Sequence, residues 1–306
     1  MAPGGYTDIF LKIHPEASVK GITLPPHLGG HPMCIPHSDK DPRVQVEFMD
    51  LTMLAVEYGT SMAEIPKEHP DAKNFSGDRP FLDETFDLVI CDGQILRTHF
   101  REDYRQTREA LRLNVAQLIF GMTRVKQGGT FVMLLHKADA FDNIELLETF
   151  DTFSKVKLVK PKKAHAPRSS FYLVAKDVDP THHKAQYAIE QWKKDWKRAT
   201  LGGDGGAGMN KEMATEIKVN AVLEEFGPRL IKLAKDIWYT QKNALERASY
   251  TKPNSPRMPT LQRKPQDENA ALGSWRKTAH SNMDSPKAKL ESVEKTPNSP
   301  NVSRKW

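Results

Sequence analysis

The chain has 306 residues, of which 38% are hydrophobic, and a formal net charge of +6. It contains two cysteines and no apolar run near the length that a membrane span needs, and its first residues do not form the charged and apolar regions of a signal peptide. These features exclude a membrane-spanning chain, argue against a disulfide framework or a zinc site, and predict an intracellular protein of the nucleus or cytoplasm.

The positive charge is concentrated near the C-terminus. Residues 240–306 hold 13 Lys and Arg against 6 Asp and Glu, so the rest of the chain is nearly neutral. The same segment is rich in Pro, Ser and Asn and lacks apolar periodicity, which predicts a disordered basic tail. Such a tail gives only a weak, salt-sensitive attraction to polyanions.

The sequence begins with a glycine turn that leads into a helical pattern. Pro3 fixes its own φ, while Gly4 and Gly5 accept positive φ and let a ligand approach the backbone closely. A glycine turn before a helix presents free N–H groups to a ligand. The turn, with Tyr6 after it, fits either a cofactor cradle or a plain N-terminal turn, and the pattern alone leaves both open.

Two short strands follow, with a loop of histidines between them. The runs Val19–Leu24 and Val44–Asp50 are predicted strands, and His27, His31 and His37 lie in the Gly- and Pro-rich connection. No helix or carboxylate-rich frame holds these histidines, and their spacing fits no metal site that we can justify. We therefore predict no metal.

The middle of the chain alternates strands with helices. Phe86–Gly93 is a nearly continuous apolar run, typical of a strand buried on both faces of a parallel sheet, with Cys91 as a small core residue. A long helix is predicted at Tyr104–Lys126 and ends at Gly128-Gly129. The elements after it are a strand at Thr130–Leu135, a helix at Ala140–Phe153, and strands at Ser154–Val159 and Phe171–Ala175, the last one antiparallel. This alternation predicts a doubly wound, mostly parallel α/β sheet.

Two further helices are predicted at Pro180–Leu201 and Lys211–Trp238, separated by a glycine cluster. The lysines around Trp192 and Trp196 could contact RNA by phosphate pairing and stacking, but an amphipathic helix that docks on the domain is favoured. A protein partner for these helices is the other expectation. The predicted organisation is an α/β domain at 1–178, a helical extension at 179–239 and the basic tail at 240–306.

Ligands of doubly wound sheets bind beyond the carboxyl ends of the strands. Gly4-Gly5, Asp50, Asp92 and Lys137 all fall at such ends or in the turns that follow them. Each has a plain explanation when taken alone, since Asp92 could cap a helix and Lys137 could be a surface lysine. Their convergence predicts one functional site.

Several segments, in their order and spacing, resemble the FtsJ-like S-adenosylmethionine-dependent RNA ribose 2′-O-methyltransferases: Ala2-Pro3-Gly4-Gly5-Tyr6, Phe86 to Gly93, Gly128-Gly129-Thr130-Phe131 to His136-Lys137, and Lys160-Pro161 to Arg168–Ala175. The likeness covers positions 1–178. It implies a Rossmann-like methyltransferase fold whose first strand is missing here, with S-adenosylmethionine as cofactor and RNA as substrate.

The resemblance also implies roles for particular residues. Asp92, at the heart of the active site, and Lys137, after the next strand, match catalytic positions. Methyl transfer to a ribose hydroxyl needs an in-line approach to a sulfonium, so positioning supplies much of the rate. The positions implied to bind the cofactor are Pro3, Gly4, Gly5, Tyr6, Thr23, Asp50 and Asp92.

The chain departs from the family pattern at several of these positions. Ser170 stands where the family has a glutamate, and Thr23 stands where many members have an acidic residue for the cofactor ribose. The family's first catalytic lysine lies upstream of the glycine turn, where this sequence has no residue. Because Met1 coincides with a position inside the cofactor motif, a truncated start and an exposed central sheet edge are expected.

Three functions remain open on these grounds. The leading prediction is an S-adenosylmethionine-dependent methyltransferase that acts on an RNA ribose 2′-hydroxyl. Ser170 and Thr23 favour the alternative, a non-catalytic module that keeps the fold and binds RNA or a protein. A nicotinamide-dependent oxidoreductase is disfavoured, because the chain lacks Gly-x-Gly-x-x-Gly and an acidic residue at the end of the strand at Leu24.

Overall fold

The computed structural model describes residues 1–35 and 40–248, all within one compact unit, so His37 and residues 249–306 of the basic tail lie outside the described residues. The helices and strands follow the chain in this order: α1 (Gly5–Ile13), β1 (Val19–Thr23), β2 (Val44–Phe48), β3 (Phe86–Cys91), α2 (Glu109–Met122), β4 (Val125–His136), α3 (Phe141–Phe153), β5 (Lys155–Val159), β6 (Ser170–Val178), α4 (His183–Leu201) and α5 (Glu216–Arg247).

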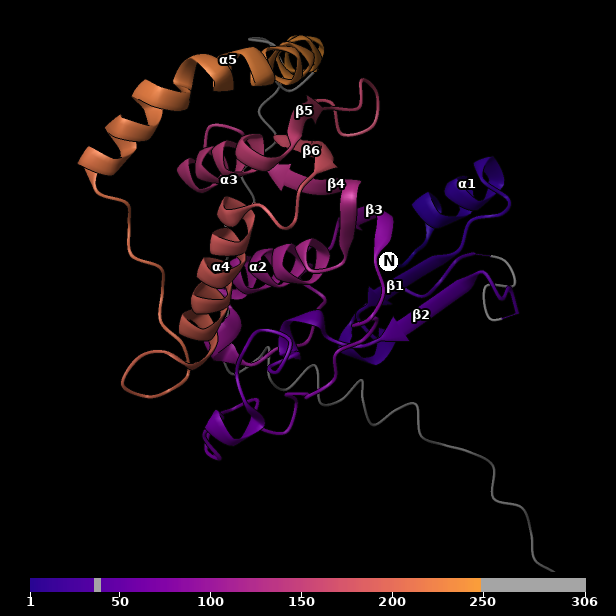
Figure 1. Cartoon of the computed structure of the whole chain (residues 1–306), viewed down its shortest axis with the longest axis vertical. Coiled ribbons are helices and arrows are strands. Elements are labelled where there is room, and N and C mark those ends of the chain that lie inside the picture. Colours follow the sequence, from indigo (N-terminus) through magenta and orange to yellow (C-terminus); the bar gives the residue numbers. More distant parts are fainter. Residues whose placement is uncertain (36–39, 249–306) are drawn as a thin grey trace, which may run out of the picture. The chain divides into compact units, whose positions relative to one another are not determined.

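The strands form two sheets, and the fold is mixed α/β (Figure 1). Strands β1 and β2 pair in parallel, and the second sheet has the order β3-β4-β6-β5. Strand β3 runs parallel to β4, whereas β6 lies between β4 and β5 and is antiparallel to both. The prediction that the last strand is antiparallel is therefore confirmed.

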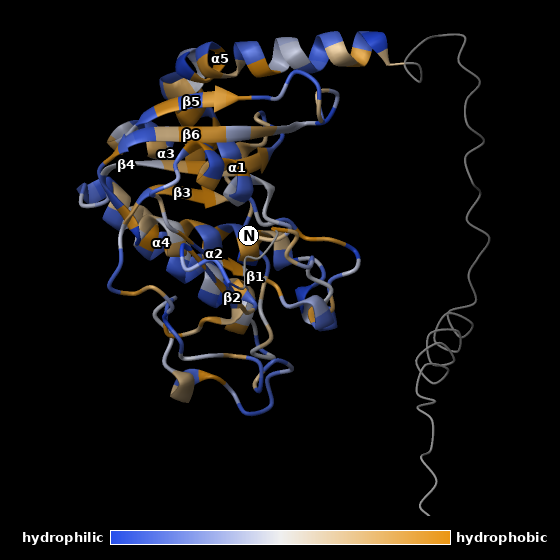
Figure 2. Ribbon diagram, turned by 90° about the vertical axis from the view of Figure 1, so that its right-hand side faces the viewer, coloured by the Kyte–Doolittle hydropathy of each residue, from blue (hydrophilic) through white to orange (hydrophobic). Residues whose placement is uncertain are grey.

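The N-terminus lies between β1 and β3 in both views (Figures 1 and 2). The Met1 ammonium donates a hydrogen bond to the Ile22 carbonyl oxygen at 2.8 Å, at the end of β1. In the described part of the chain, β1 and β3 do not pair with each other, so the parallel strands fall into two ladders.

Strand β3 is less buried than its apolar sequence indicates. Its Val89 and Cys91 side chains lie under α2, close to Gly121, and Cys91 is buried as predicted. Ile90 points to the opposite face and is 40% exposed. The prediction of burial on both faces was wrong. Helix α2 covers the face with Val89 and Cys91, whereas the face with Ile90 is partly open to solvent.

The boundary between α2 and β4 also differs from the prediction. The helix ends at Met122, and Val125 already pairs with Phe86 in the sheet. Arg124, between them, buries its guanidinium against Glu57, and its carbonyl oxygen accepts the Phe86 N–H at 2.8 Å. Gly128, with φ of 76°, therefore lies in an irregular stretch of β4 and does not end the helix.

Helices cover both faces of the sheets, with α1 on one side and α2, α3 and α4 on the other (Figures 1 and 2). Helix α4 docks as predicted, because Trp196 is fully buried and its Nε1–H donates to the Thr52 carbonyl oxygen at 3.0 Å. Helix α5 packs on β5 and α3 and continues to Arg247, beyond position 239, since the residues there are helix formers without Pro or Gly. Its buried side chains are those of Phe226, Leu230, Ala234 and Ile237.

Candidate functional site

The glycine turn positions the start of α1. Gly4 has φ of 101°, and its carbonyl oxygen accepts the Asp8 N–H at 2.9 Å. A side chain at Gly4 would be strained by that φ and would collide with Ile35. A Cβ at Gly5 would instead meet open space. Gly4 is thus required by the turn itself, and Gly5 leaves room for a ligand beside the backbone.

Thr23, at the end of β1, is already engaged by the chain. Its side-chain oxygen accepts the Ala2 N–H at 3.2 Å, and its side chain is largely buried. The neighbouring residue Met1 also contacts β1, because its side chain lies against Gly21. Residues 1 and 2 therefore run alongside the last residues of β1.

Asp92 follows β3 directly and lies close to the N-terminus. Burial raises the pKa of its carboxyl, and the nearby Met1 ammonium lowers the pKa and so partly opposes this effect. The next residue is fixed by Gln117 of α2, whose amide accepts the Gly93 N–H at 2.7 Å and donates to the Gly93 carbonyl at 3.2 Å. Helix α2 therefore sets the path of the chain after Asp92.

Asp50 lies after β2 in a network of buried charges. One carboxylate oxygen accepts the Thr52 N–H at 2.9 Å and its hydroxyl at 2.8 Å, and the other accepts Arg105 at 2.7 Å. Burial alone raises the pKa of Asp50, but Arg105 and Thr52 outweigh this effect and lower the pKa. Arg105 also pairs with Glu109, which pairs with the fully buried Arg112.

Lys137 follows β4 in an unusual backbone conformation. Its φ is 58°, in the left-handed region, which costs a non-glycine residue about 1–3 kcal/mol. The amide of Asn143, from α3, donates to the carbonyl oxygens of His136 and Lys137 and holds the turn. The exposed Lys137 side chain has no ion pair or hydrogen bond within residues 1–35 and 40–248.

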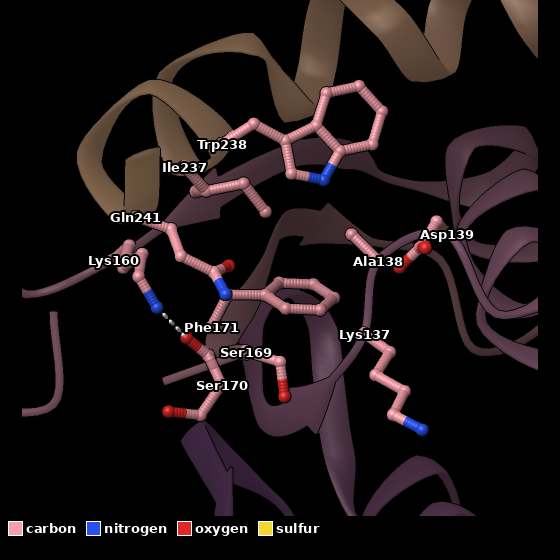
Figure 3. A pocket seen from close by; sticks show the side chains of 10 residues that line it. All are labelled: Lys137, Ala138, Asp139, Lys160, Ser169, Ser170, Phe171, Ile237, Trp238 and Gln241. Carbon is pink, nitrogen blue, oxygen red and sulfur yellow. Dashed lines mark hydrogen bonds between the residues drawn. The ribbon is translucent and has the colours of Figure 1, made fainter. Parts of the chain in front are cut away.

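A cavity of about 560 Å³ lies beside Lys137 (Figure 3). We call it the Lys137 cavity; its lining residues are Lys137, Ala138, Asp139, Lys160, Ser169, Ser170, Phe171, Ile237, Trp238 and Gln241. The structure thus brings Lys137 and Ser170 together, as the sequence order implies. The Lys137 N–H donates to the Ser169 carbonyl oxygen at 3.1 Å, which joins the ends of β4 and β6.

Lys160 is a site residue to which sequence reasoning assigned no role. Its buried ammonium donates to the carbonyl oxygens of Arg168 at 2.5 Å and Ser170 at 2.6 Å, so it closes the β5–β6 loop at the cavity wall. Burial lowers its pKa. The only sequence signal was its place before a proline at the end of a strand.

Two hydrogen bonds link the remaining predicted residues. Gln94, two residues after Asp92, pairs with His136, the neighbour of Lys137, at 3.0 Å. The Tyr6 hydroxyl hydrogen-bonds the Tyr172 hydroxyl of β6 at 2.5 Å. The first bond joins the segment after Asp92 to the residue before Lys137, and the second joins the start of α1 to β6, whereas Asp50 belongs to the separate Arg105 network.

Neither a candidate metal centre nor a membrane-spanning helix is found in the part of the chain that the structure describes. Among residues 1–35 and 40–248, no group of three or more His, Cys, Asp or Glu side chains could hold a metal ion. No helix of these ranges has both the length and the hydrophobicity to cross a bilayer.

The model of the FtsJ-like methyltransferase family matches residues 1–178 of the chain. Among solved structures, a similar chain is titled "Alphavirus P23pro-zbd"; it is 13% identical, with a TM-score of 0.28, over 68% of this chain and 27% of that one. This chain therefore spans about a quarter of that structure, and a likeness this weak carries no argument. No curated protein matches the chain.

Proposed function

The chain belongs to the FtsJ-like methyltransferase family, and from this premise we propose that it transfers a methyl group from S-adenosylmethionine to a ribose 2′-hydroxyl of RNA. The observation that carries the acceptor class is the charge at the Lys137 cavity. Lys137 and Lys160 line it, and Asp139 alone carries a carboxylate among its described lining residues. Such a surface suits a polyanion better than a neutral small molecule.

The loop between β5 and β6 adds to this charge. It begins at Lys160, carries exposed Lys162 and Lys163, and ends near Arg168, whose carbonyl Lys160 holds. Phosphate contacts from lysine and arginine supply affinity and register for a nucleic acid without reading its sequence. The loop therefore supports RNA as the acceptor.

The residues at the strand ends fit S-adenosylmethionine. When bound, this cofactor supplies an electrophilic methyl group on a sulfonium. The Asp92 carboxyl supplies the opposite charge when it is ionised, and Gly5 leaves space at the backbone. Asp50 accepts three hydrogen bonds, which leaves one acceptor position for an adenine amino group. We call the residues proposed to contact the cofactor the cofactor wall; its remaining members are Pro3, Gly4, Tyr6 and Thr23.

Lys137 and Ser170 are the groups proposed to face the acceptor ribose. The left-handed turn at Lys137 presents an ammonium with no ion partner in the described ranges. It can donate a hydrogen bond to the acceptor hydroxyl or to a neighbouring phosphate. Ser170 supplies a hydroxyl but no charge. Positioning of the hydroxyl is therefore the main contribution of this wall to the rate.

Binding and transfer can be tested separately. Calorimetry with S-adenosylmethionine is expected to show binding that Asp92→Asn weakens at least tenfold, which is about 1.4 kcal/mol. Asp87→Asn is the matched control, because Asp87 lies on the same strand with an exposed side chain. Methyl transfer to RNA, mapped to the 2′-oxygen, should be lost in Lys137→Ala and kept in Lys157→Ala, an exposed lysine of β5. Absence of cofactor binding by the unmodified chain would refute the proposal.

One observation favours the alternative, a non-catalytic RNA- or protein-binding module. At the wall of the Lys137 cavity Ser170 stands in place of a carboxylate, and Lys160 is held by carbonyl oxygens only. Under this alternative the chain binds RNA through the basic loop without methylating it. RNA binding that persists without cofactor binding and without transfer would establish this second function.

A further inference from the structure

The Lys137 cavity has two walls from distant parts of the chain. One is formed by the turn after β4 and the start of β6, within the residues that match the family model. The other is formed by Ile237, Trp238 and Gln241 of α5, which lies outside that match. Figure 3 shows the Trp238 indole above Phe171 and Ala138, across the opening from Ser170.

Helix α5 is fixed against the domain. Arg229 makes two hydrogen bonds to Asp151 of α3, at 3.0 and 2.8 Å. Leu230, Ala234 and Ile237 are buried in the hydrophobic core. The stretch of α5 that leads into Trp238 is therefore held against the domain.

The α5 wall does more than pack on the domain, because Trp238 lies partly against the hydrophobic core and partly at the cavity. Trp238 is only partly buried, so one part of its ring faces the cavity. Gln241, one turn further along, carries an amide that can both donate and accept hydrogen bonds. An aromatic face next to an amide, with Lys137 on the other wall, matches a nucleobase attached to a phosphodiester.

We propose that α5 completes the acceptor site, with Trp238 stacking on a base of single-stranded RNA and Gln241 hydrogen-bonding the edge of that base. The cavity volume of about 560 Å³ lies in the range of pockets that hold small-molecule groups of nucleotide size. That RNA is the methyl acceptor rests on the proposed function. The contact of α5 with RNA is tested separately, by the affinity of the chain for RNA.

The test is the affinity for a fluorescently labelled single-stranded RNA of mixed sequence, measured by anisotropy on the full chain. Trp238→Ala is expected to raise Kd about 5- to 150-fold, because stacking of one base on an aromatic side chain contributes about 1–3 kcal/mol. Trp238→Phe should retain much of the affinity. Tyr239→Ala is the matched control, since Tyr239 is the next residue of α5, is 63% exposed and does not line the cavity; its Kd should stay within twofold.

A second variant guards against loss of folding in Trp238→Ala. Gln241→Leu keeps the size of the side chain but removes its amide, so it should raise Kd for RNA while the thermal unfolding midpoint stays unchanged. Binding of S-adenosylmethionine should be the same in all four variants. If Trp238→Ala and Gln241→Leu bind RNA like the unmodified chain, or if that chain binds no RNA, the α5 proposal is wrong. If the unmodified chain binds RNA but not S-adenosylmethionine, the proposed function is wrong and the α5 proposal is still decided by the RNA affinities.

Discussion

Tyr6 and Tyr172 share a hydrogen bond of 2.5 Å between their hydroxyls, although 166 residues separate them in the sequence. Their rings meet edge to face, with centroids 6.4 Å apart. Tyr6 lies in the first turn of α1, directly after the glycine turn, and Tyr172 lies in the strand that also carries Ser170. This contact joins the proposed cofactor wall to the proposed acceptor wall.

The variant Tyr6→Phe removes this hydrogen bond and keeps the ring. A hydrogen bond of this kind contributes about 0.5–1.5 kcal/mol. We expect the Kd for S-adenosylmethionine, measured by calorimetry, to rise severalfold while the unfolding free energy changes little, because Tyr6 is half exposed. Tyr239→Phe, on the outer side of α5, is the control. An unchanged cofactor affinity would show that the two walls are positioned without this bond.

Trp196 is the residue through which α4 is anchored. We expect Trp196→Ala to lower the unfolding free energy by about 3–5 kcal/mol, because it empties a fully buried site and leaves the Thr52 carbonyl oxygen without its donor. Urea denaturation followed by circular dichroism measures the change. Tyr187→Ala on the same helix should have a small effect, since Tyr187 is 64% exposed. Equal losses of unfolding free energy in Trp196→Ala and Tyr187→Ala would contradict the buried position of Trp196.

The ion pair of Glu57 and Arg124 is fully buried. Arg124→Met is expected to destabilise the fold by about 3–5 kcal/mol at pH 7, because it leaves the Glu57 carboxylate without its main partner. Lys126→Met, which breaks an exposed pair with Asp87, is the control and should cost at most about 1 kcal/mol. Chemical denaturation of both variants provides the comparison.

The same pair predicts a pH dependence. Burial alone raises the pKa of Glu57, but hydrogen bonds and charge from Arg124 and Arg79 outweigh it, so the pKa in the folded state lies below the unfolded value of about 4.3. The stability from this group is present above that value and is lost as the pH falls through the lower folded pKa. The destabilisation by Arg124→Met should shrink when unfolding is measured in acid, and a cost that stays constant would exclude ionised Glu57 as its origin.

Lys160→Met removes the ammonium that holds two carbonyl oxygens at the cavity wall. We expect a loss of about 1–3 kcal/mol in unfolding free energy, because the carbonyl oxygens of Arg168 and Ser170 lose a charged donor. The folded pKa of Lys160 is lowered by burial, so the unfolded state binds more protons in alkaline solution, and this group makes stability rise with pH between the folded pKa and about 10.4. That rise should be absent in Lys160→Met and present in Lys157→Met.

The sequence pattern predicted most of the regular elements because their apolar residues repeat with the period of each element. On the apolar stripe that helical spacing predicts for α2, Val115, Leu118, Ile119 and Met122 are buried and Leu111 is partly buried. The antiparallel β6 was predicted as well. The start of β4 was missed because it depends on Arg124, whose buried partner Glu57 is far away in the sequence.

Residues between β2 and β3 gave no signal for their structure. They form short turns in which polar side chains are buried, such as His69 and Asp71. Tyr104 donates to Asp71 at 2.6 Å, and His69 contacts the Thr200 carbonyl oxygen at 3.0 Å. Polarity in a sequence normally indicates solvent exposure, so a core of paired charges and hydroxyls cannot be recognised before the partners are known.

The candidate site was predicted in part. The strand ends place Lys137 and Ser170 on one cavity, and Asp92 near the glycine turn, as the α/β order implies. The α5 wall could not be predicted, because helical periodicity shows which residues of α5 are apolar but not which part of the domain they meet. The catalytic roles of Asp92 and Lys137 stay predictions, as do the cofactor-binding roles of all the residues proposed for them, Asp50 and Thr23 included.

The two walls of the Lys137 cavity are encoded in separate stretches of the chain. Substitutions at the positions of Trp238 and Gln241 change one wall without altering Gly4, Asp92 or the buried side chains of α5. If α5 forms the proposed acceptor contact, drift in this helix can alter that contact during evolution while the residues that match the family model stay unchanged.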